Sequence, residues 1–282
     1  MIQDLEGAQF SNAWRDIQPN PEDRIYLRKG PDVLVNEAGE LPMRWELPHM
    51  TDAEYRYLFE AGDERHFLCL TEMAMLGARG CVWRNARQWA RNVRPMYRAL
   101  AGFTAMHLAD WYGKNRFCGC CGGETVPGHD ERKMVCPRCG NVIYPRLNPA
   151  VIAAVTDGDR LLMTRYQPSH RPVSHFVLVA GFVEIGETAE QCVAREVLEE
   201  TGLRVKHIRY AGSQPWGSEG NLTLGYYCEL DGDDTITLQE DELGEGRWFR
   251  RDEVPVPDDD VSITAHMIRA FRDGREWETP FS

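Results

Sequence analysis

The spacing of apolar residues divides the chain into regions with different expected structures. Two short apolar runs, 23–27 and 32–35, flank a Gly-Pro pair, which predicts two strands joined by a turn. From residue 83 to about residue 112, apolar positions recur every three or four residues, which predicts a helix. Pro95 interrupts this helix, because proline has no N–H to donate within it. The first part of the chain is therefore expected to be a mixed α/β domain.

In the last part of the chain, from about residue 148, segments with the apolar spacing of strands are mixed with segments that have the spacing of helices. Strands are predicted at 150–156, 160–164, 176–182, 204–212, 222–230 and 247–250. A helix is predicted from Thr188 to Thr201, and Gly202 is well suited to end it. Ser262 is expected to cap a second helix that runs to about residue 272. This mixture predicts an α/β (α+β) fold in which a sheet packs between helices.

Between these parts lies a segment without periodicity that contains five of the nine cysteines. Its sequence, FCGCCGGETVPGHDERKMVCPRCG, holds two Cys-x-x-Cys pairs separated by 14 residues. Such pairs present thiolates at the angles that a tetrahedral zinc requires, and four of them leave no position open for catalysis. One structural zinc per chain is therefore predicted, on Cys118, Cys121, Cys136 and Cys139. Cys120 is interpreted as a bystander, and the other four cysteines, Cys69, Cys81, Cys192 and Cys228, as core residues.

Three glutamates on the helix 188–201 are the strongest candidates for chemistry. Glu196, Glu199 and Glu200 lie about one turn apart, which puts their carboxylates on one helical face. Taken alone, such a face is more often a solvated surface than a metal site. The alternative is that divalent cations neutralise it, since carboxylate oxygens are ligands that Mg²⁺ and Mn²⁺ prefer.

The residues around these glutamates favour the metal site. The chain matches the pattern Gly-x5-Glu-x7-Arg-Glu-U-x-Glu-Glu-x-Gly-U, where U is a bulky apolar residue, at Gly181, Glu187, Arg195, Glu196, Val197, Glu199, Glu200, Gly202 and Leu203. This segment resembles the Nudix box. The resemblance implies a mixed sheet sandwiched between helices, and hydrolysis of a diphosphate linked to another moiety, usually a nucleoside.

The resemblance also implies roles for individual residues. The groups expected to bind the catalytic Mg²⁺ or Mn²⁺ are Glu196, Glu199, Glu200, Glu245 and the carbonyl of Ala180. The four glutamates among them are the expected catalytic residues, because bound cations would offset the diphosphate charge and lower the pKa of an attacking water. Gly181, Glu187 and Arg195 are expected to be structural, with Arg195 paired to Glu187.

A zinc ribbon directly before a Nudix box, behind a separate N-terminal domain, is similar to the NADH pyrophosphatases. This resemblance implies an N-terminal domain over 1–112, a zinc ribbon over 113–147 and a Nudix domain over 148–282. It also implies a homodimer that cleaves NAD(H) to nicotinamide mononucleotide and AMP, and removal of NAD caps from RNA 5′ ends in some members. The alternatives are another substrate, such as ADP-ribose, FAD or a dinucleoside polyphosphate, and a non-catalytic nucleotide sensor.

Ten residues are expected, from the same resemblance, to contact the substrate. They are Arg87, Glu131, Tyr144, Phe182, Gln214, Pro215, Trp216, Gly217, Asn221 and Thr264. Tyr144 and Phe182 would stack on a flat base but could equally be core residues, and Glu131 on sequence grounds alone is more often a solvated loop residue. The family continues Ser-Gln-Pro-Trp with Pro-Phe-Pro. This chain has Gly-Ser-Glu instead, which loosens the loop and adds a negative charge.

Arginines at positions 84, 87, 91, 94 and 98 are spaced three and four residues apart. On the predicted helix this spacing would put them on one face. The face could be solvated and paired with the acidic bulk of the protein, or it could contact a substrate phosphate or the RNA behind a cap. Both interpretations stay open.

The composition narrows the partners and the compartment. The 282 residues are 43% hydrophobic and 27% charged, and 44 acidic against 32 basic residues give a net charge of -12. This balance is too acidic for a general nucleic-acid coat protein, which needs clustered Lys and Arg. The chain starts without the basic and apolar regions of a signal peptide, and no apolar run approaches the roughly 18 residues of a membrane span. Since the cysteines are spaced for a metal, we expect a cytoplasmic protein. The lack of a long apolar run predicts no contact with a membrane, and the resemblance to the NADH pyrophosphatases implies a small dinucleotide as substrate.

Overall fold

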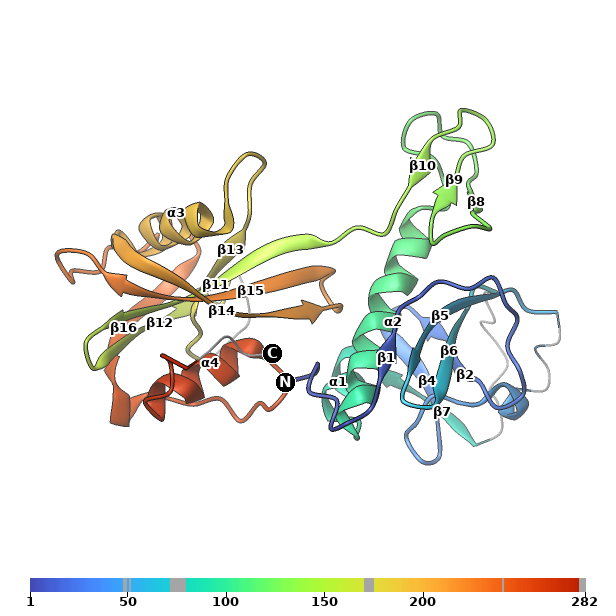
Figure 1. Ribbon diagram of the computed structural model, residues 1–282, viewed down its shortest axis with the longest axis horizontal. Helices are drawn as coiled ribbons and strands as arrows, with labels where there is room; N and C mark the ends of the chain where they lie inside the picture. Colours follow the sequence, from blue (N-terminus) through green and yellow to red (C-terminus); the bar gives the residue numbers. More distant parts are fainter. Residues whose placement is uncertain (48–49, 51, 72–79, 170–174, 240, 279–282) are drawn as a thin grey trace. The chain divides into compact units, whose positions relative to one another are not determined.

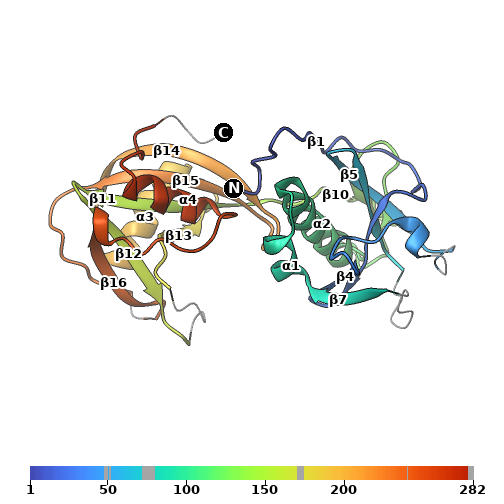
Figure 2. The same cartoon turned by 90° about the horizontal axis from the view of Figure 1, so that it is seen from below.

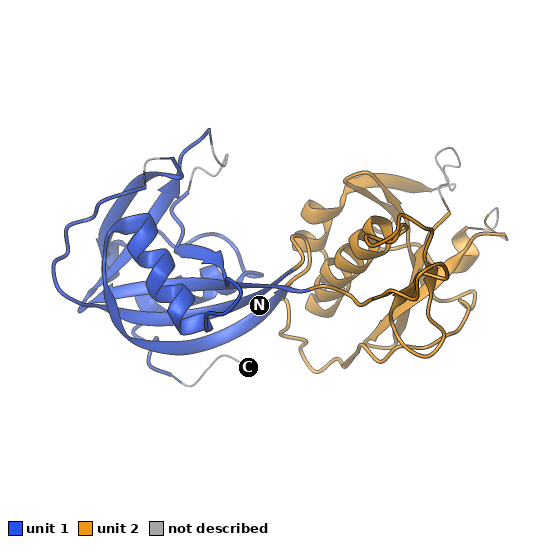
Figure 3. Cartoon of the chain, turned by 90° about the horizontal axis from the view of Figure 1, so that it is seen from above, with its two compact units in different colours: residues 1, 147–215, 221–282 blue, residues 2–146, 216–220 orange. Residues whose placement is uncertain are grey.

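A computed structural model describes residues 1–47, 50, 52–71, 80–169, 175–239 and 241–278. The chain divides into two compact units, which Figure 3 colours separately. One contains Met1, Leu147–Pro215 and Asn221–Ser282, and we call it the sandwich unit. The other contains Ile2–Arg146 and Trp216–Gly220, and we call it the ribbon unit. Within the described ranges, no helix is long and apolar enough to cross a membrane.

The sandwich unit is built on one sheet. Its strands are β11 (Asn148–Asp157), β12 (Arg160–Tyr166), β13 (Val179–Phe182), β14 (Val205–Trp216), β15 (Asn221–Leu230) and β16 (Leu243–Arg250), followed by a 3-10 turn, η2 (Arg251–Glu253). The strand order is β14-β15-β11-β12-β16, and β13 also pairs with β11. β11 runs parallel to β15 and antiparallel to β12 and β13. The sheet is therefore mixed, as the Nudix resemblance implied.

Two helices, α3 (Ala189–Thr201) and α4 (Ile263–Arg272), cover opposite faces of this sheet, as Figures 1 and 2 show. Successive side chains of β11 point to opposite faces. Val151 and Val155 pack in the core under α3, whereas Ala154 packs in the core under α4. Burial on both faces explains the continuous apolar run of this strand. The predicted α/β sandwich is confirmed.

Local sequence sets both ends of α3. The Thr188 hydroxyl accepts a hydrogen bond from the Gln191 backbone N–H at 3.2 Å, and the Gln191 side chain accepts one from the Thr188 N–H at 2.8 Å. This capping box satisfies donors that the first turn of a helix leaves unpaired. Gly202 ends the helix at a φ of 72°, which other residues rarely adopt. Ser262 caps α4 by accepting from the Ala265 N–H. Both predicted helices are confirmed.

The described part of the ribbon unit contains three small sheets and two helices. The sheet orders are β1-β5-β6-β2, β3-β4-β7 and β10-β9-β8. The elements are β1 (Phe10–Ser11), β2 (Arg24–Tyr26), β3 (Arg28–Lys29), β4 (Asp32–Asn36), η1 (Arg44–Glu46), β5 (Tyr55–Ala61), β6 (Glu64–Cys69), β7 (Cys81–Asn85), α1 (Ala86–Asn92), α2 (Met96–Lys114), β8 (Val126–Pro127), β9 (Met134–Val135) and β10 (Val142–Ile143). The β8–β10 sheet carries the cysteine segment.

The helical region around Pro95 differs in part from the prediction. α1 ends at Asn92 and α2 begins at Met96, so the predicted break at Pro95 is confirmed. The prediction that the helix begins at Trp83 is wrong, because Trp83 lies in β7 and pairs with β4. Strand pairing outweighs the weak local preference for a helix at this point.

Two side chains anchor the cysteine segment within the ribbon unit. The Arg132 guanidinium donates to Asn12 Oδ1 at 2.6 Å and to the carbonyl of Leu58. Trp111 Nε1 donates to the carbonyl of Tyr144 at 3.0 Å. These contacts fix the chain on both sides of the second Cys-x-x-Cys pair.

Candidate functional site

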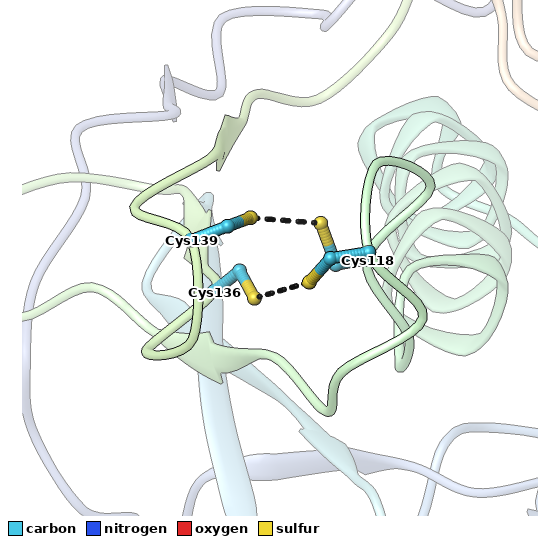
Figure 4. Close-up of side chains that lie close together, drawn as sticks. Cys118, Cys136 and Cys139 are labelled. Carbon is cyan, nitrogen blue, oxygen red and sulfur yellow. Dashed lines mark hydrogen bonds between the residues drawn. The ribbon is translucent and has the colours of Figure 1, made fainter.

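The four cysteines of the two Cys-x-x-Cys pairs converge. Their sulfur atoms lie within 4.8 Å of one another, with Cys118 and Cys139 separated by 3.6 Å and Cys121 and Cys136 by 3.5 Å. Figure 4 shows the labelled sulfurs pointing toward one another. Four sulfurs placed about 2.3 Å from a tetrahedral zinc would lie about 3.8 Å apart, so the cluster fits this ion. Cys120 is exposed and lies outside the group.

The backbone also favours zinc binding at this cluster. The N–H of Cys120 points at the Cys118 sulfur at 3.4 Å and lowers the pKa of this thiol to about 6. Since zinc binds the thiolate, this ligand is ionised near neutral pH. Of the cysteines expected in the core, Cys69, Cys192 and Cys228 are buried and Cys81 is partly buried.

Glu196 packs against Gly181 of β13. A Cβ added to Gly181 would lie 1.9 Å from the carboxyl carbon of Glu196, so no larger residue fits without moving this carboxylate. Burial raises the pKa of Glu196. Ala180 precedes this glycine on β13 and pairs with Ile152 of β11, and the role of its carbonyl as a metal ligand stays a prediction.

Arg195 holds three acidic side chains at once. Its Nη2 and Nε donate to the Glu187 carboxylate at 2.6 and 3.1 Å, which forms the expected pair and lowers the pKa of Glu187 to about 2. Its Nη1 donates to Glu196 at 2.8 Å and to Glu199 at 3.0 Å. The guanidinium therefore stands between two carboxylates that would otherwise repel each other.

Glu200 is the buried member of the set. Its side chain is 2% exposed, and its Oε2 has no hydrogen-bond partner among the described residues. Burial raises the pKa of Glu200 to about 8, and the negative charges of Glu242, Glu196 and Glu199 add to this effect. A buried carboxylate without a partner is costly unless a proton or a metal ion satisfies it.

Glu242 is a residue that the sequence analysis did not single out. Its negative charge raises the pKa of both Glu196 and Glu200, so its carboxylate acts on the same site. Glu245, the acid expected to complete the site, faces Arg165 across the β12–β16 pair and forms an ion pair with it. The role of Glu245 as a metal ligand stays a prediction. The sequence signal that could have pointed to Glu242 is the run of acidic residues that ends at this position.

These carboxylates fit a divalent cation by their chemistry. Their oxygens are donors that Mg²⁺ and Mn²⁺ prefer, and Glu200 Oε2 is an acceptor that no described group satisfies. The raised pKa values of Glu196 and Glu200 indicate that their negative charge is not offset. A bound cation would supply the missing positive charge. Over the described ranges, only the four cysteines already converge as closely as a bound metal requires.

The two candidate stacking rings lie at the surface. Phe182 is 56% exposed and Tyr144 is 55% exposed, which excludes the alternative that they are core residues. The Tyr144 hydroxyl donates to Glu131 at 2.9 Å, and Lys133 donates to the same carboxylate at 3.1 Å. Glu131 and Tyr144 are thus brought together, while the Glu131 side chain stays 50% exposed in a loop, and its contact with substrate stays a prediction.

Gln214 braces the start of α4. It is 1% exposed, its amide nitrogen donates to the Val261 carbonyl, and its amide oxygen accepts from the Ile263 N–H, both at 2.8 Å. Thr264, in the first turn of this helix, is partly exposed, and Pro215 is exposed. The segment therefore presents Pro215 and Thr264 to solvent while Gln214 holds them in place.

The last residues of the segment 214–221 belong to different units. In the ribbon unit, Gly217 is buried and the Trp216 ring stacks on Phe103. In the sandwich unit, Asn221 is 7% exposed, and its Oδ1 has no partner within the described residues. This buried acceptor suits an N–H group of a ligand.

The five arginines do not share a helical face, so that prediction is wrong. Arg84 lies on β7, and α1 and α2 are separate helices. Arg98 of α2 is bonded to Glu64 at 2.9 Å and to Glu40, which gives it a structural role. Arg87 of α1 pairs with Glu219 at 2.8 Å.

Two family descriptions match the chain. A NUDIX domain matches residues 146–271, and an NADH pyrophosphatase zinc ribbon domain matches residues 114–144. The two matches together contain the four cysteines and the glutamates of α3.

Several curated relatives share the name NAD-capped RNA hydrolase NudC. The protein of Pseudomonas syringae pv. tomato is 36% identical over 244 residues, which cover 84% of this chain and 84% of that protein. The protein of Pseudomonas aeruginosa strain PAO1 is 36% identical over 273 residues, which cover 96% of this chain and 84% of that protein. The protein of Escherichia coli O157:H7 is 43% identical over 169 residues, which cover 60% and 64%. Among solved structures, a NUDIX hydrolase from Nitrosomonas europaea matches with a TM-score of 0.47 and 24% identity, over 58% of this chain and 94% of that chain.

Proposed function

The chain belongs to the Nudix hydrolases that carry an NADH pyrophosphatase zinc ribbon, the family of the NAD-capped RNA hydrolases NudC, and on this premise we propose that it hydrolyses the diphosphate of NAD(H). The products are nicotinamide mononucleotide, oxidised or reduced, and AMP. The names of the relatives support a second form of the same reaction, in which the NAD is the cap at the 5′ end of an RNA.

The environment of the α3 glutamates is the observation that carries this proposal. Glu196, Glu199 and Glu200 share one helix, and the charge of Glu242 acts on two of them. A protein that only senses a nucleotide has no need of a buried carboxylate whose Oε2 lacks a partner among the described residues and which lies near other acids. A hydrolase needs such a site to hold the cations that a diphosphate requires.

Each group has a proposed task in the reaction. Bound Mg²⁺ or Mn²⁺ supplies charge to the diphosphate oxygens and lowers the pKa of the attacking water. The proposed ligands are Glu196, Glu199, Glu200, Glu242, Glu245 and the carbonyl of Ala180. Gly181 leaves room for the Glu196 carboxylate, and the Arg195–Glu187 pair ties α3 to the segment before it.

The substrate contacts are proposed from exposure and from unsatisfied groups. Phe182 and Tyr144 offer exposed rings for stacking on a base, and Asn221 Oδ1 offers a buried acceptor. The remaining proposed contacts are Arg87, Glu131, Pro215 and Thr264, with Gln214 holding the segment. Because Gly-Ser-Glu replaces Pro-Phe-Pro after Trp216, ADP-ribose, FAD and dinucleoside polyphosphates are the alternative substrates to test.

The zinc, the assembly and the compartment complete the proposal. The four-cysteine cluster fits a structural zinc with no open position. The family likeness supports a homodimer. All nine cysteines are free, which supports a reducing compartment such as the cytoplasm.

A substrate panel tests the proposal. We would measure kcat/KM with Mg²⁺ and with Mn²⁺ for NADH, NAD⁺, NAD-capped RNA, ADP-ribose, FAD and a diadenosine polyphosphate, by release of AMP or of the corresponding nucleotide. We expect the highest value for an NAD-containing substrate. A higher value for another dinucleotide would change the assigned substrate, and no release from any of them would overturn the assignment as a diphosphatase.

A further inference from the structure

The turn between β14 and β15, residues 216–220, belongs to the ribbon unit, whereas the rest of both strands belongs to the sandwich unit (Figure 3). Two backbone bonds close the turn, from the Glu219 N–H to the Trp216 carbonyl and from the Gly220 N–H to the Gly217 carbonyl, each at 3.3 Å. Its sequence, Trp-Gly-Ser-Glu-Gly, is flexible by itself because glycine restricts the backbone so little. Contacts within the ribbon unit therefore decide whether the turn is fixed.

Trp216 makes two ring contacts in this unit. Its ring stacks on Phe103 of α2, with centroids 4.8 Å apart and planes 28° apart. The guanidinium of Arg91 on α1 lies 5.5 Å from the Trp216 ring centroid, within the range of a cation–π contact. Phe103 is 1% exposed, so this partner belongs to the core of the unit and cannot itself touch a ligand.

Gly217 lies directly against the backbone of α2. A Cβ added to it would lie 1.9 Å from the carbonyl oxygen of Phe103 and 3.3 Å from the Cβ of His107. The φ of Gly217 lies outside the left-handed region, so the close approach, not the backbone conformation, requires glycine here. Any other residue would force the turn away from the helix.

Glu219 provides the third contact. Its carboxylate accepts a hydrogen bond from Arg87 Nη2 on α1 at 2.8 Å. Both side chains are partly exposed, at 31% and 50%, so the pair orients the turn more than it stabilises the fold. Two of the three residues that replace Pro-Phe-Pro, Gly217 and Glu219, thus both contact the helices.

We propose that Trp216, Gly217 and Glu219 are positioning residues, which dock the turn on α1 and α2. The turn is continuous in sequence with the strand ends that carry Gln214 and Asn221. Gln214 in turn holds the start of α4, and Asn221 presents its buried acceptor. In this arrangement the Trp216 ring and Gly217 serve the protein's own helices rather than the ligand. The kinetic part of this inference rests on the proposed function, because the strand ends act there on a dinucleotide.

Gly217→Ala tests the docking directly. We expect hydrogen exchange of the amides in 216–220 to become about tenfold faster, while exchange in the buried strand β11 stays unchanged. Gly113→Ala is the matched control, because Gly113 lies on α2 and a Cβ there would meet none of the described residues within 4 Å. Unchanged exchange in the turn of Gly217→Ala would overturn the docking.

Phe103→Leu separates positioning from direct contact with the substrate. Because Phe103 is buried, it does not touch a ligand itself, and it contacts the turn through the Trp216 ring. For both Phe103→Leu and Gly217→Ala we expect KM for NADH to rise about fivefold with kcat within about twofold of wild type. The unfolding midpoint of each variant is measured alongside, to separate this effect from a loss of fold.

The outcomes distinguish this inference from the proposed function. Faster exchange in the turn with unchanged KM would show that the docked turn does not position the substrate, and would leave the hydrolase assignment intact. A KM that rises for Gly217→Ala but not for Phe103→Leu would show that Gly217 meets the substrate itself, which overturns the positioning role. If wild type hydrolysed no dinucleotide, the proposed function would fail, and the exchange comparison would still decide whether the turn is docked.

Discussion

The two metal-binding segments differ in what holds their ligands before a metal is bound. In the ribbon unit four thiols from two short loops already lie within 4.8 Å of one another. On α3 the carboxylates do not converge in this way: Glu196 and Glu199 are bonded to Arg195, and the buried Glu200 Oε2 has no partner among the described residues. A closed structural site gains by being assembled in advance, whereas an open catalytic site must keep its cations exchangeable. The comparison teaches that a side-chain cation, the Arg195 guanidinium, can hold two proposed metal ligands, Glu196 and Glu199, before any metal is bound.

Removal of one zinc ligand should have the largest effect. Cys136→Ser leaves three thiolates, and structural zinc sites contribute on the order of 10 kcal/mol to the folding of small domains. We expect loss of zinc and unfolding of the segment 117–140, measured by metal content and by hydrogen exchange. Cys120→Ser is the control and should keep one zinc per chain, because Cys120 lies outside the cluster. Full zinc content in Cys136→Ser would contradict the four-cysteine site.

Removal of one α3 carboxylate should abolish activity without unfolding the protein. Glu199→Gln removes a proposed metal ligand from a side chain that is 53% exposed. We expect kcat/KM for NADH to fall about a thousandfold, or about 4 kcal/mol, with a change in unfolding free energy within about 0.5 kcal/mol. Glu190→Gln, in the first turn of the same helix, should keep wild-type activity. Equal activity of Glu199→Gln and wild type would show that the metal assignment is wrong.

Low pH should reduce the stability of the ribbon unit by protonating a buried histidine as well as the zinc ligands. His66 is buried with no partner for either ring nitrogen in the described part of the chain, and burial lowers its pKa from 6.5 to about 3. Between these pH values the unfolded chain binds a proton that the folded chain does not, so stability falls as pH falls below about 6.5. From pH 7 to pH 5 the loss is about 2 kcal/mol.

A variant separates the histidine from the zinc. In His66→Phe the free energy of unfolding should depend less on pH between 7 and 5 than in wild type, with zinc content checked at both values. Any decrease in the free energy of unfolding at low pH that remains in His66→Phe is due to protonation of the zinc thiolates. The same pH dependence in both proteins would rule out His66 as a source.

Loss of the α3 cap should have the smallest effect. Thr188→Ala removes the hydroxyl that accepts from the Gln191 N–H and should lower the free energy of unfolding by about 1 kcal/mol. We expect kcat to stay within about twofold, because the helix, not the cap, carries the glutamates. Thr188→Ser should restore the stability. A large loss of kcat in Thr188→Ala would mean that the start of α3 belongs to the active site.

The parts of the structure that local sequence determines were predictable. The spacing of the cysteines gives their convergence, since a Cys-x-x-Cys turn places both sulfurs by itself. Thr188 and Gly202 mark the ends of α3 through cap chemistry that involves only neighbouring residues. The break at Pro95 follows in the same way from a missing N–H.

The parts that depend on distant partners were not predictable. Trp83 enters a strand because β4 lies beside it, although its own neighbours favour a helix. Glu242 belongs to the glutamate site through the fold, since nothing in its sequence neighbourhood distinguishes it from other acids there. Arg98 has a structural role because it bonds Glu64 and Glu40, which lie 34 and 58 residues earlier in the chain. In each case a residue far along the chain decides the outcome.

The assignment of residues 216–220 to the ribbon unit limits how the protein can be divided. The chain passes from one unit to the other between 1 and 2, between 146 and 147, and on both sides of the turn. A single cut after residue 146 would leave the Trp216 ring without Phe103 and Gly217 without its helix. The fragment 147–282 would expose an aromatic side chain and a glycine-rich hairpin end to solvent, where proteases cut and chains associate. A sandwich unit prepared alone should therefore carry a shortened, polar hairpin in place of this turn.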